Sequence, residues 1–447
     1  MNAKTGLVLE PSTATAIAAM RERAAAGSTL GQVLGRPLLD WQRESRAALG
    51  LPADRPVVLT GHQAGIWHAG ILAKWLLADS IARSSGAATA AILVDQDTND
   101  AGAIAYPSLV DGLPRVAMLP TLPSRRGGPT GLARPVRVAP PEGETVPELL
   151  PRLAAIAAAV NAEAKAADLA RQVSAANDRL LRDRLGLEPP TTIAASRLLE
   201  LPFAAALLGG FAAGPEAATA YAAALASDPR AARPLARGEL PAWRLVPGEP
   251  FGRREPVRVG DPPPTAPVRL APRAFLLTAI ARLVLGDLFI HGTGGGRYER
   301  VTEEWIRRWL GIRLAPMAVA SATLRLPLAT GLEASVTLTP AAFRRISIDP
   351  DATGSAPSAA SRTFLEAIAA APRRSAARRE AYRGLIADRE RRRRGDAERL
   401  ARLASEVERS RVAAAALEVA RSRTWPWPLH DDASLAALVA SIRETRS

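Results

Sequence analysis

The sequence predicts an α/β protein built on a parallel sheet, and two segments carry this prediction. Residues 57–82 (VVLTGHQAGIWHAGILAKWLLADSIA) run from an apolar strand through a small-residue turn into a helix, and the strand AAILVDQD follows at residues 90–97. Residues 288–311 (LFIHGTGGGRYERVTEEWIRRWLG) repeat the order of strand, glycine turn and helix. A strand, a helix and a second strand within about forty residues form a βαβ unit, which places its two strands parallel.

The chain is long enough for more than one domain. It has 447 residues, of which 48% are hydrophobic, and chains of this length rarely fold around one core. We expect the sheet core to be divided between residues 1–150 and 269–350. Residues 151–268 are then a helical and irregular insertion, and residues 351–447 form charged helices and a tail.

The elements outside the two strand–turn–helix segments are mostly helical. Prolines and glycines dominate residues 105–150, which predicts loops or an irregular excursion from the sheet. The proline-studded residues 228–268 contain short strands, and a further strand is expected at 318–328. Apolar spacing of three and four residues, or a high alanine content, predicts helices within residues 11–50, 149–185, 193–227, 271–286 and 360–424.

Composition excludes several classes of function. The chain has no cysteine, so disulfides, thiolate catalysis and cysteine-ligated metals are excluded. Its first residues lack a basic stretch followed by a long apolar one, and therefore do not resemble a signal peptide. The apolar run at residues 273–290 carries charges and breaks at Gly286, so we expect no membrane span. The expected location is the cytoplasm.

The formal net charge of +14 is concentrated near the C-terminus. Between Arg373 and Arg423 there are 16 arginines and 8 acidic residues, a net charge of +8. This stretch is interpreted as a solvated helix packed on its own domain, as a coiled coil that forms a homodimer, or as a nucleic-acid-binding helix. Nucleic acid is the least favoured partner, because arginines alternate with glutamates and no aromatic residue interleaves the RRRR run. Near-heptad spacing supports the coiled coil at Leu400, Leu403, Val407, Ala414 and Leu417.

Two of the four histidines lie in the turn that follows the first strand. The carboxyl end of a parallel strand is the edge where open α/β sheets bind ligands, so His62 and His68 are candidate catalytic residues. Gly61 and Gly65 allow the backbone to approach a ligand, and the amides that open the following helix point toward an anion. Lys74 either reaches the same anion or faces solvent. The alternative is that His62 caps the helix and His68 is a partly buried helical residue.

Asp95 and Asp97 end the second strand, at the same edge of the predicted sheet. An acidic residue at this place accepts hydrogen bonds from ribose hydroxyls, and a pair two residues apart binds a cation or a substrate ammonium. The alternative is a strand-end turn in which these side chains satisfy local amides.

A glycine cluster follows the later strand. We expect the amides of residues 292–297 to form a nest for phosphate or carboxylate, with Arg297 as a charged partner and Thr302 as the cap of the next helix. His291 directly precedes this turn and is a third candidate catalytic histidine. An ordinary strand-to-helix turn is the alternative. No metal is expected, because no two histidines have the i, i+4 spacing of zinc helices. The glycines of the predicted nest are Gly292, Gly294, Gly295 and Gly296.

These segments resemble a known family in their order and spacing. Residues 57–82 with AILVDQDTND, and residues 271–305, are similar to two segments of the bacillithiol-biosynthesis cysteine-adding enzymes. The charged helices at 360–424 match the placement of that family's coiled coil. The segment FIHGTGGGRYERVTE also resembles an uncharacterised bacterial family. The resemblance covers about a third of the chain.

The resemblance implies a Rossmann-like core of the nucleotidyltransferase type, with a helical attachment and coiled-coil-like C-terminal helices. It implies a ligase-like enzyme that joins a small amine or amino acid, such as cysteine, to an activated or sugar-like acceptor. The implied cofactor is ATP, ADP or another nucleotide. In this scheme the histidines stabilise developing negative charge. The match assigns to the pocket Gly61, Gln63, Gly65, Asp95, Asp97, Gly294, Gly295 and Tyr298.

Three departures from the family leave the substrate open. His62 stands where the cysteine-adding enzymes usually carry glutamine, the acidic motif is DQDTND, and His291 precedes the glycine turn. Two other functions therefore remain. One is a nucleotide-binding or scaffold protein without catalysis, and the other is a nucleic-acid-associated protein that acts through the arginine-rich helix.

Overall fold

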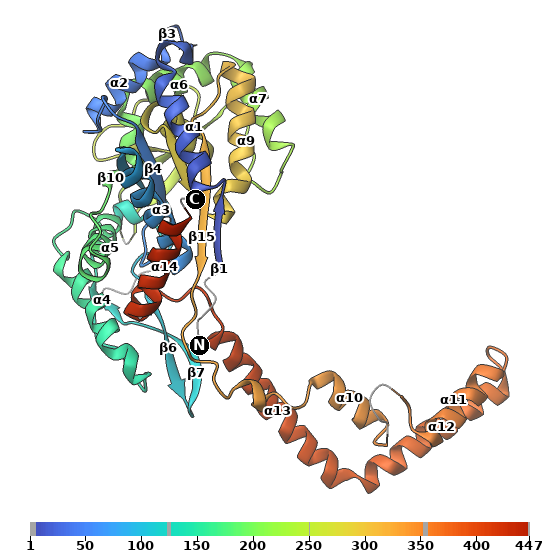
Figure 1. Ribbon diagram of the computed structural model, residues 1–447. Coiled ribbons are helices and arrows are strands. Elements are labelled where there is room, and N and C mark those ends of the chain that lie inside the picture. The colour runs from blue at the N-terminus through green and yellow to red at the C-terminus, as the bar shows by residue number, and fades with distance from the viewer. Residues whose placement is uncertain (1–5, 123–126, 250, 352–355, 446–447) are drawn as a thin grey trace. The chain divides into compact units, whose positions relative to one another are not determined.

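The computed structural model describes residues 6–122, 127–249, 251–351 and 356–445, and it contains two compact units (Figure 1). The first unit comprises Met1–Tyr106, Ala117–Leu326 and Arg423–Ser447. The second comprises Pro107–Val116 and Pro327–Ser422. Both predicted strand–turn–helix segments therefore belong to the first unit.

The first unit is built on a six-stranded sheet in which five strands are parallel. The predicted α/β class with a parallel sheet is confirmed. One edge strand, β1, pairs antiparallel with β15 and has no counterpart in the predicted elements. The strands, in the order of the sheet, are β1 (Gly6–Glu10), β15 (Met317–Thr323), β14 (Leu288–His291), β4 (Val57–Gln63), β5 (Ala88–Val94) and β10 (Thr191–Ala194).

The strand order reverses in the middle of this sheet. β4 comes first among the parallel strands in the sequence, and β5 and β10 follow it outward on one side. The chain then returns to the other side of β4 and adds β14 and β15. In open α/β sheets, the crevice outside the carboxyl ends of the strands at such a reversal is the usual place for a ligand.

Part of residues 105–150, predicted as loops or an irregular excursion from the sheet, forms short strands. β6 and β7 form a hairpin whose turn residues, Asp111 and Gly112, have φ values of 51° and 72°. A two-residue turn with positive φ at both positions favours an Asp-Gly pair, so this hairpin had a sequence signal. The smaller sheets consist of β2 (Gln32–Val33), β3 (Arg36–Pro37), β6 (Ala105–Val110), β7 (Leu113–Met118), β8 (Thr121–Leu122), β9 (Arg137–Val138), β11 (Glu239–Val246), β12 (Arg253–Arg258) and β13 (Arg269–Pro272).

Helices cover both faces of the large sheet. α3 lies on one face, where it contacts β4, β5, β14 and β15, and α1 and α14 pack against α3. α2, α6, α8 and α9 bury their apolar side chains on the other face. The helices of this unit are α1 (Thr13–Ala25), α2 (Leu38–Ala48), α3 (Ala69–Ser85), α4 (Leu150–Ala162), α5 (Leu169–Leu185), α6 (Pro202–Ala213), α7 (Pro215–Leu225), α8 (Ala274–Ile280), α9 (Thr293–Leu310) and α14 (Asp432–Glu444).

Two of the predicted helices are interrupted. Residues 193–227 begin in β10 and continue through a 3₁₀ helix (Ala195–Glu200) into α6 and α7, each of which starts at a proline. Proline suits the first helical turn but not a helix interior, which explains the breaks. Residues 271–286 start at the end of β13, form α8 and then widen into a π-helical turn, Ala281–Leu285, whose side chains are all buried.

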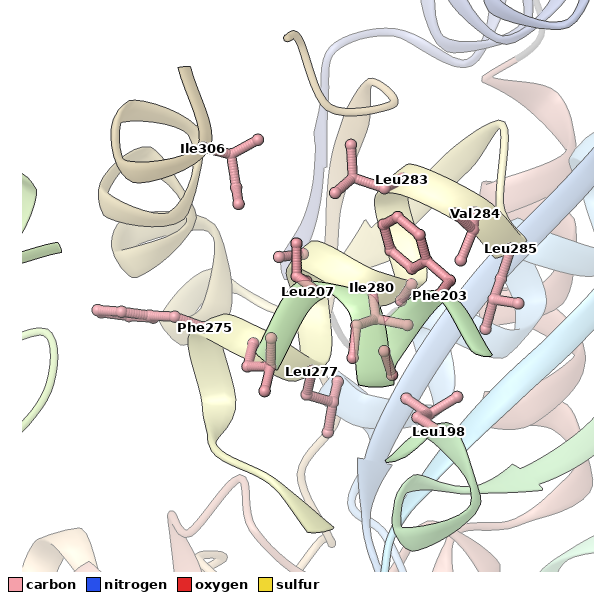
Figure 2. Close-up of a cluster of buried hydrophobic side chains, with 14 of the residues drawn as sticks. Leu198, Phe203, Leu207, Phe275, Leu277, Ile280, Leu283, Val284, Leu285 and Ile306 are labelled. Carbon is pink, nitrogen blue, oxygen red and sulfur yellow. The ribbon is translucent and has the colours of Figure 1, made fainter. Parts of the chain in front are cut away.

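A large apolar core lies between the sheet and the helices of the second face (Figure 2). Phe203 and Leu207 of α6 meet Phe275 and Ile280 of α8 there, and each of the four is at most 2% exposed. This burial holds α8 and the π-helical turn firmly against the sheet. The loop that leads from them to β14 is thereby fixed next to the start of β4, where the Asp287 amide donates to the Val57 carbonyl at 2.8 Å.

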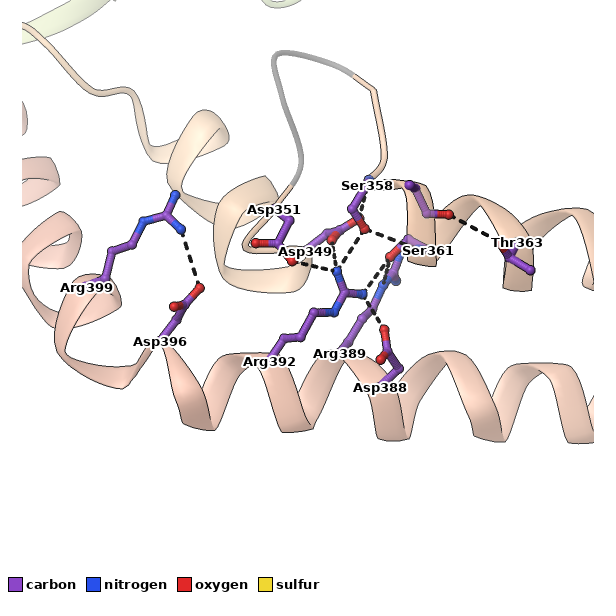
Figure 3. A network of polar contacts seen from close by, with 11 residues as sticks. Asp349, Asp351, Ser358, Ser361, Thr363, Asp388, Arg389, Arg392, Asp396 and Arg399 are labelled. Atoms are coloured by element: carbon purple, nitrogen blue, oxygen red, sulfur yellow. Dashed lines mark hydrogen bonds and ion pairs between the residues drawn. The ribbon is translucent and has the colours of Figure 1, made fainter.

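The second unit is mainly helical. Its helices are α10 (Pro340–Ile348), α11 (Ala359–Ala370), α12 (Ala376–Gly395) and α13 (Ala397–Ala420). Arg392 of the RRRR run pairs with Asp349 at 2.9 Å and with Asp388 at 2.6 Å, and it donates to the Ser358 hydroxyl at 2.8 Å (Figure 3). This arginine therefore ties α12 to the segments around α10 and α11.

The predicted heptad positions of α13 are only partly buried. Leu400, Leu403, Val407 and Leu417 are half-buried, whereas Ser410 is 2% exposed. The Ser410 hydroxyl accepts from the amides of residues 337 and 338, at 3.2 and 3.1 Å. Across the described parts of both units, no helix is long and apolar enough to cross a membrane.

Candidate functional site

A cavity of about 390 Å³ opens at the point where the strand order of the sheet reverses. Its wall includes residues 61–63 at the end of β4, residues 291–295 where β14 leads into α9, and Gln96 and Asp97 after β5. The first turns of α3 and α8 close the sides. The structure thus brings the two histidine-bearing strand ends, far apart in the sequence, into one cavity.

Most of the sequence-predicted site residues line this cavity. They are Gly61, His62, Gln63, His68, Lys74, Asp97, His291, Gly292, Gly294, Gly295 and Tyr298. Three others do not belong to the wall, and their places are described below: Gly65, Asp95 and Gly296.

His68 caps α3 and also faces the cavity. Its Nδ1 accepts a hydrogen bond from the Gly70 amide at 3.0 Å, so the ring proton of the neutral imidazole is on Nε2. Burial, with Arg423 and Lys74 nearby, lowers the pKa of His68. The cap of α3 is therefore His68 and not His62, which the sequence offered as the alternative, and the same ring lines the cavity. The free Nε2–H is a hydrogen-bond donor for a ligand.

In His62 the donor and acceptor roles of the two ring nitrogens are reversed. Its Nδ1 lies 3.1 Å from the carbonyl oxygen of Gln63, which only accepts, so Nδ1 carries the proton and Nε2 is left as an acceptor. Burial and the neighbouring Lys74 lower the pKa of His62 to about 3. His62 therefore suits contact with a ligand N–H or O–H, and the charge-stabilising role expected for both histidines fits His68 better.

His291 is 6% exposed and lies against the first turn of α9. Its Nε2 is 3.5 Å from Oε1 of Glu299, and neither atom has a hydrogen-bond partner among the described residues. Burial lowers the pKa of His291 well below its ordinary value. Arg282 of the π-helical turn pairs with the same glutamate at 2.7 Å, so a buried network lies behind the cavity.

The glycine cluster starts a helix rather than forming the predicted nest. Gly292 is the N-cap of α9, and the Gly296 amide already donates to the Gly292 carbonyl at 3.1 Å. Thr302, predicted as the helix cap, lies inside α9 with no exposed surface. The prediction was wrong because the glycines themselves adopt helical backbone angles. The amides of the first turn of a helix have no acceptor within it and favour an anion, so the cavity still contains an anion-binding feature.

Two glycines of this helix allow close packing. A Cβ atom at position 295 would lie 2.5 Å from Nδ1 of His291, and one at position 296 would lie 2.6 Å from Cγ2 of Val319. Gly295 thus makes room for the imidazole, and Gly296 lets α9 approach β15. Arg297 is in α9, but its side chain is outside the described part of the structure.

We expect Gly295→Ala to lower the free energy of unfolding by about 1–3 kcal/mol, because the new methyl group displaces a buried ring. Gly294→Ala is the matched control, since a Cβ there has no neighbour within 4 Å. Alanine is otherwise the better helix former, which makes the control neutral or slightly stabilising. Thermal unfolding of both variants checks this, and equal melting temperatures would contradict it.

The two predicted aspartates have different places. Asp95 is fully buried, and its carboxylate accepts from the amide and the hydroxyl of Ser196 at 2.9 and 2.6 Å. Burial raises the pKa of Asp95. Asp97 lines the cavity, where it accepts from Arg254 at 2.9 Å and from the Gln63 amide. The pair therefore does not form a two-carboxylate site, and the described residues contain no cluster of three metal-ligating side chains.

Gly65 lies beside the cavity, where its carbonyl oxygen accepts from Asn177 at 2.8 Å. Tyr298 of α9 is in the wall, and burial raises the pKa of its phenol to about 12. The phenol therefore stays protonated and can donate a hydrogen bond.

Trp243, Arg273 and Arg423 are among the wall residues that the sequence did not predict. Arg273 precedes α8, is 9% exposed and stacks at 3.8 Å on the ring of Trp243 from β11. It also pairs with the buried Glu239. Arg423 is exposed and weakly bonded to Thr323 at 3.4 Å. The two arginines were visible only as members of an arginine-rich composition, and no local signal placed Trp243 near the sheet edge.

Three basic side chains, Lys74, Arg273 and Arg423, line the cavity. Arg273 is paired with the buried Glu239, and Asp97, the acidic residue in the wall, is paired with Arg254. The cavity also has the volume of small-molecule sites, which begin at about 300 Å³. No family model matches the chain, and no curated protein matches it. The fold and the site therefore define the class: an α/β protein with a small-ligand cavity suited to an anion.

Proposed function

We propose that this chain is a ligase-like enzyme with a Rossmann-like core of the nucleotidyltransferase type, related to the bacillithiol-biosynthesis cysteine-adding enzymes. In this proposal it joins a small amine or amino acid, such as cysteine, to an activated or sugar-like acceptor. The observation that carries the proposal is the single cavity at the strand-order reversal, which contains both glycine turns and three histidines.

The strand order supports the Rossmann-like part of the proposal. Numbered by their order in the chain, the parallel strands β10, β5, β4, β14 and β15 stand as 3-2-1-4-5. This is the order of dinucleotide-binding sheets, in which the ligand lies at the strand 1–strand 4 reversal.

The groups in the wall provide roles for both reactants. The first turn of α9, with Arg273 and Arg423, would hold a phosphate or carboxylate of a nucleotide or acceptor. Asp97 would accept from a ribose hydroxyl or a substrate ammonium. The Nε2–H of His68 would donate to an oxygen that becomes negative during the reaction.

A homodimer through the C-terminal helices belongs to the same proposal. The half-buried heptad leucines of α13 support it, as do Tyr382 and Ile386 of α12, which are 46% and 55% exposed. Apolar side chains at heptad spacing on a charged helix are typical of a coiled-coil seam.

We expect ATP or ADP, and small amino acids including cysteine, to raise the melting temperature of the protein. A ligand at one hundred times its dissociation constant stabilises the folded state by about 2.7 kcal/mol. Arg423→Gln should weaken the effect of the nucleotides without changing the melting temperature of the free protein, because this side chain is exposed and weakly bonded.

Arg43→Gln on α2 is the matched control, since it removes an exposed arginine outside the cavity wall. A thermal-shift series over ligand concentration gives the apparent dissociation constants of the three proteins. If no nucleotide and no amino acid shifts the wild-type protein, the proposed function is wrong. If Arg423→Gln and Arg43→Gln respond alike, the ligand binds elsewhere.

A further inference from the structure

One basic group of the cavity has no role in the proposal above. The chain contains three lysines, Lys4, Lys74 and Lys165, among 58 basic residues. Arginine keeps its proton in proteins, whereas a lysine amine that is buried can lose it. In a chain that uses arginine almost everywhere, the lysine at position 74 is therefore chemically distinct.

Lys74 extends from α3 into the wall of the cavity and is 4% exposed. Its Nζ donates to the carbonyl oxygen of Gly61 at 2.5 Å. Among the described residues, no carboxylate forms an ion pair with it. An ammonium group has three protons to donate, so the site satisfies it incompletely. A buried charge without a counter-ion is costly, and the neutral amine is the form that this environment favours.

The titratable and charged groups around Lys74 provide no opposite charge. His62, His68 and His291 come from β4, the start of α3 and β14, and Arg423 adds a positive charge. Asp97 is engaged by Arg254 and Gln63. On the helices packed against α3, the charges are directed elsewhere: Arg23 of α1 donates to the Arg313 carbonyl, and Arg443 of α14 faces Asp79.

The neighbouring histidines are poor proton acceptors. Burial lowers all three pKa values, that of His62 to about 3. Nδ1 of His68 is occupied by the Gly70 amide, and Nε2 of His291 faces Glu299. Burial lowers the pKa of Lys74 to about 7, which leaves the lysine as the basic group that changes protonation near neutral pH. A base whose pKa lies near the working pH is the most effective one.

We propose that Lys74 is the general base of the cavity and accepts the proton of the incoming nucleophile. This inference rests on the proposed function. The nitrogen of the amine uses its lone pair to bond to the electrophilic atom of the activated acceptor, and one N–H bond breaks. The proton passes to Nζ, and the electron pair of that bond stays on nitrogen. The leaving group departs with the electron pair of its own bond and can receive the proton from the Lys74 ammonium.

The test is a pH titration of the full-length protein labelled with [ε-¹³C]lysine and followed by NMR. Three lysines give three side-chain signals, assigned with Lys74→Met and Lys165→Arg. Lys165 is exposed and is the internal control, and the reference is the ordinary lysine pKa of about 10.4. The Lys74 signal should titrate with a midpoint about three units lower. A midpoint within one unit of that of Lys165 overturns the proposal.

Competitive acetylation with acetic anhydride at pH 7 then asks whether the amine is reachable from the cavity. A neutral Lys74 should be acetylated at least about tenfold faster than Lys165, because a larger fraction of it is unprotonated. Mass spectrometry of the two peptides gives the rates. Protection of Lys74 from the reagent, with Lys165 labelled, overturns the proposal because a base must reach its substrate.

These readouts need no nucleotide, so they separate the two proposals. A low midpoint and fast acetylation, without a thermal shift by any nucleotide or amino acid, support a basic lysine and contradict the proposed function. A high midpoint with a clear nucleotide shift overturns the base and leaves the proposed function standing. Thermal unfolding of each variant reports in every case whether the protein is folded.

Discussion

Arg282→Met should lower the free energy of unfolding by about 3–5 kcal/mol, because it leaves a buried carboxylate without its partner. Arg282 is 1% exposed and pairs at 2.7 Å with Glu299, which has no exposed surface. It also donates to the carbonyl of Ala315 at 2.8 and 2.6 Å and to the carboxylate of Glu303 at 2.5 Å. The substitution therefore removes the partner of a whole buried network. Chemical or thermal unfolding measures the loss.

The effect of Arg282→Met should depend on pH. Burial already raises the pKa of Glu299, and removal of Arg282 raises it further. A carboxyl group whose pKa is higher in the folded state binds its proton more tightly there. The folded variant is therefore least disfavoured at low pH and loses stability as the pH rises through that pKa. The deficit relative to the wild type should be larger at pH 8 than at pH 5.

Two further variants test this explanation. Arg282→Met with Glu299→Gln should recover part of the loss, because an uncharged amide is less costly to bury than a carboxylate. Arg308→Met removes an exposed pair with Glu304 on the same helix and should cost less than about 1 kcal/mol. If Arg282→Met is no more destabilising than Arg308→Met, the buried network does not stabilise α9.

Lowering the pH from 7 to 4.5 should destabilise the first unit by several kcal/mol. All four histidines have lowered pKa values, that of His62 about 3 and that of His430 about 4. In the unfolded chain each takes up a proton below about pH 6.5, whereas in the folded state it does so only at lower pH. Stability is therefore complete above that value and falls toward acid pH, by about 2 kcal/mol each for His62 and His430 at pH 4.5.

His430→Gln isolates one of these contributions. His430 is 2% exposed, and its Nε2 has no hydrogen-bond partner among the described residues. Between pH 7 and 4.5 the variant should lose about 2 kcal/mol less stability than the wild type, because one group that titrates in the unfolded chain is gone. The carboxylates titrate alike in both proteins. Parallel stability curves for the two proteins over this range would exclude the histidine as a cause.

Local pattern was sufficient for the central strands and their turns. β4, β5 and β14 are short apolar runs that end at glycine or polar residues, so their sequences alone indicate them. β1 and β10 have weaker local signals. Residues 191–194 lead into an alanine-rich run that favours helix, and they form a strand because they pair with residues 90–93 of β5. That pairing joins residues about a hundred positions apart, which no local window contains.

The residues of the candidate site were likewise predictable only in part from the sequence. The strand-end rule placed His62, His68, His291 and the glycines at one edge of the sheet, because the carboxyl ends of parallel strands share that edge. It gave no means to separate Asp95 from Asp97. The amide and the hydroxyl of Ser196, from the segment after β10, donate hydrogen bonds to the Asp95 carboxylate.

The sequence by itself determined an α/β protein whose histidines and glycines stand at strand ends, because those features depend on neighbours along the chain. Only the tertiary structure decided which side chains reach the cavity and which protons they hold. The cavity wall includes Trp243, Arg273 and Arg423, which come from segments that are distant in the sequence. The pKa of Lys74 is lowered because several elements together remove it from water, and this loss of hydration exists only once the chain has folded.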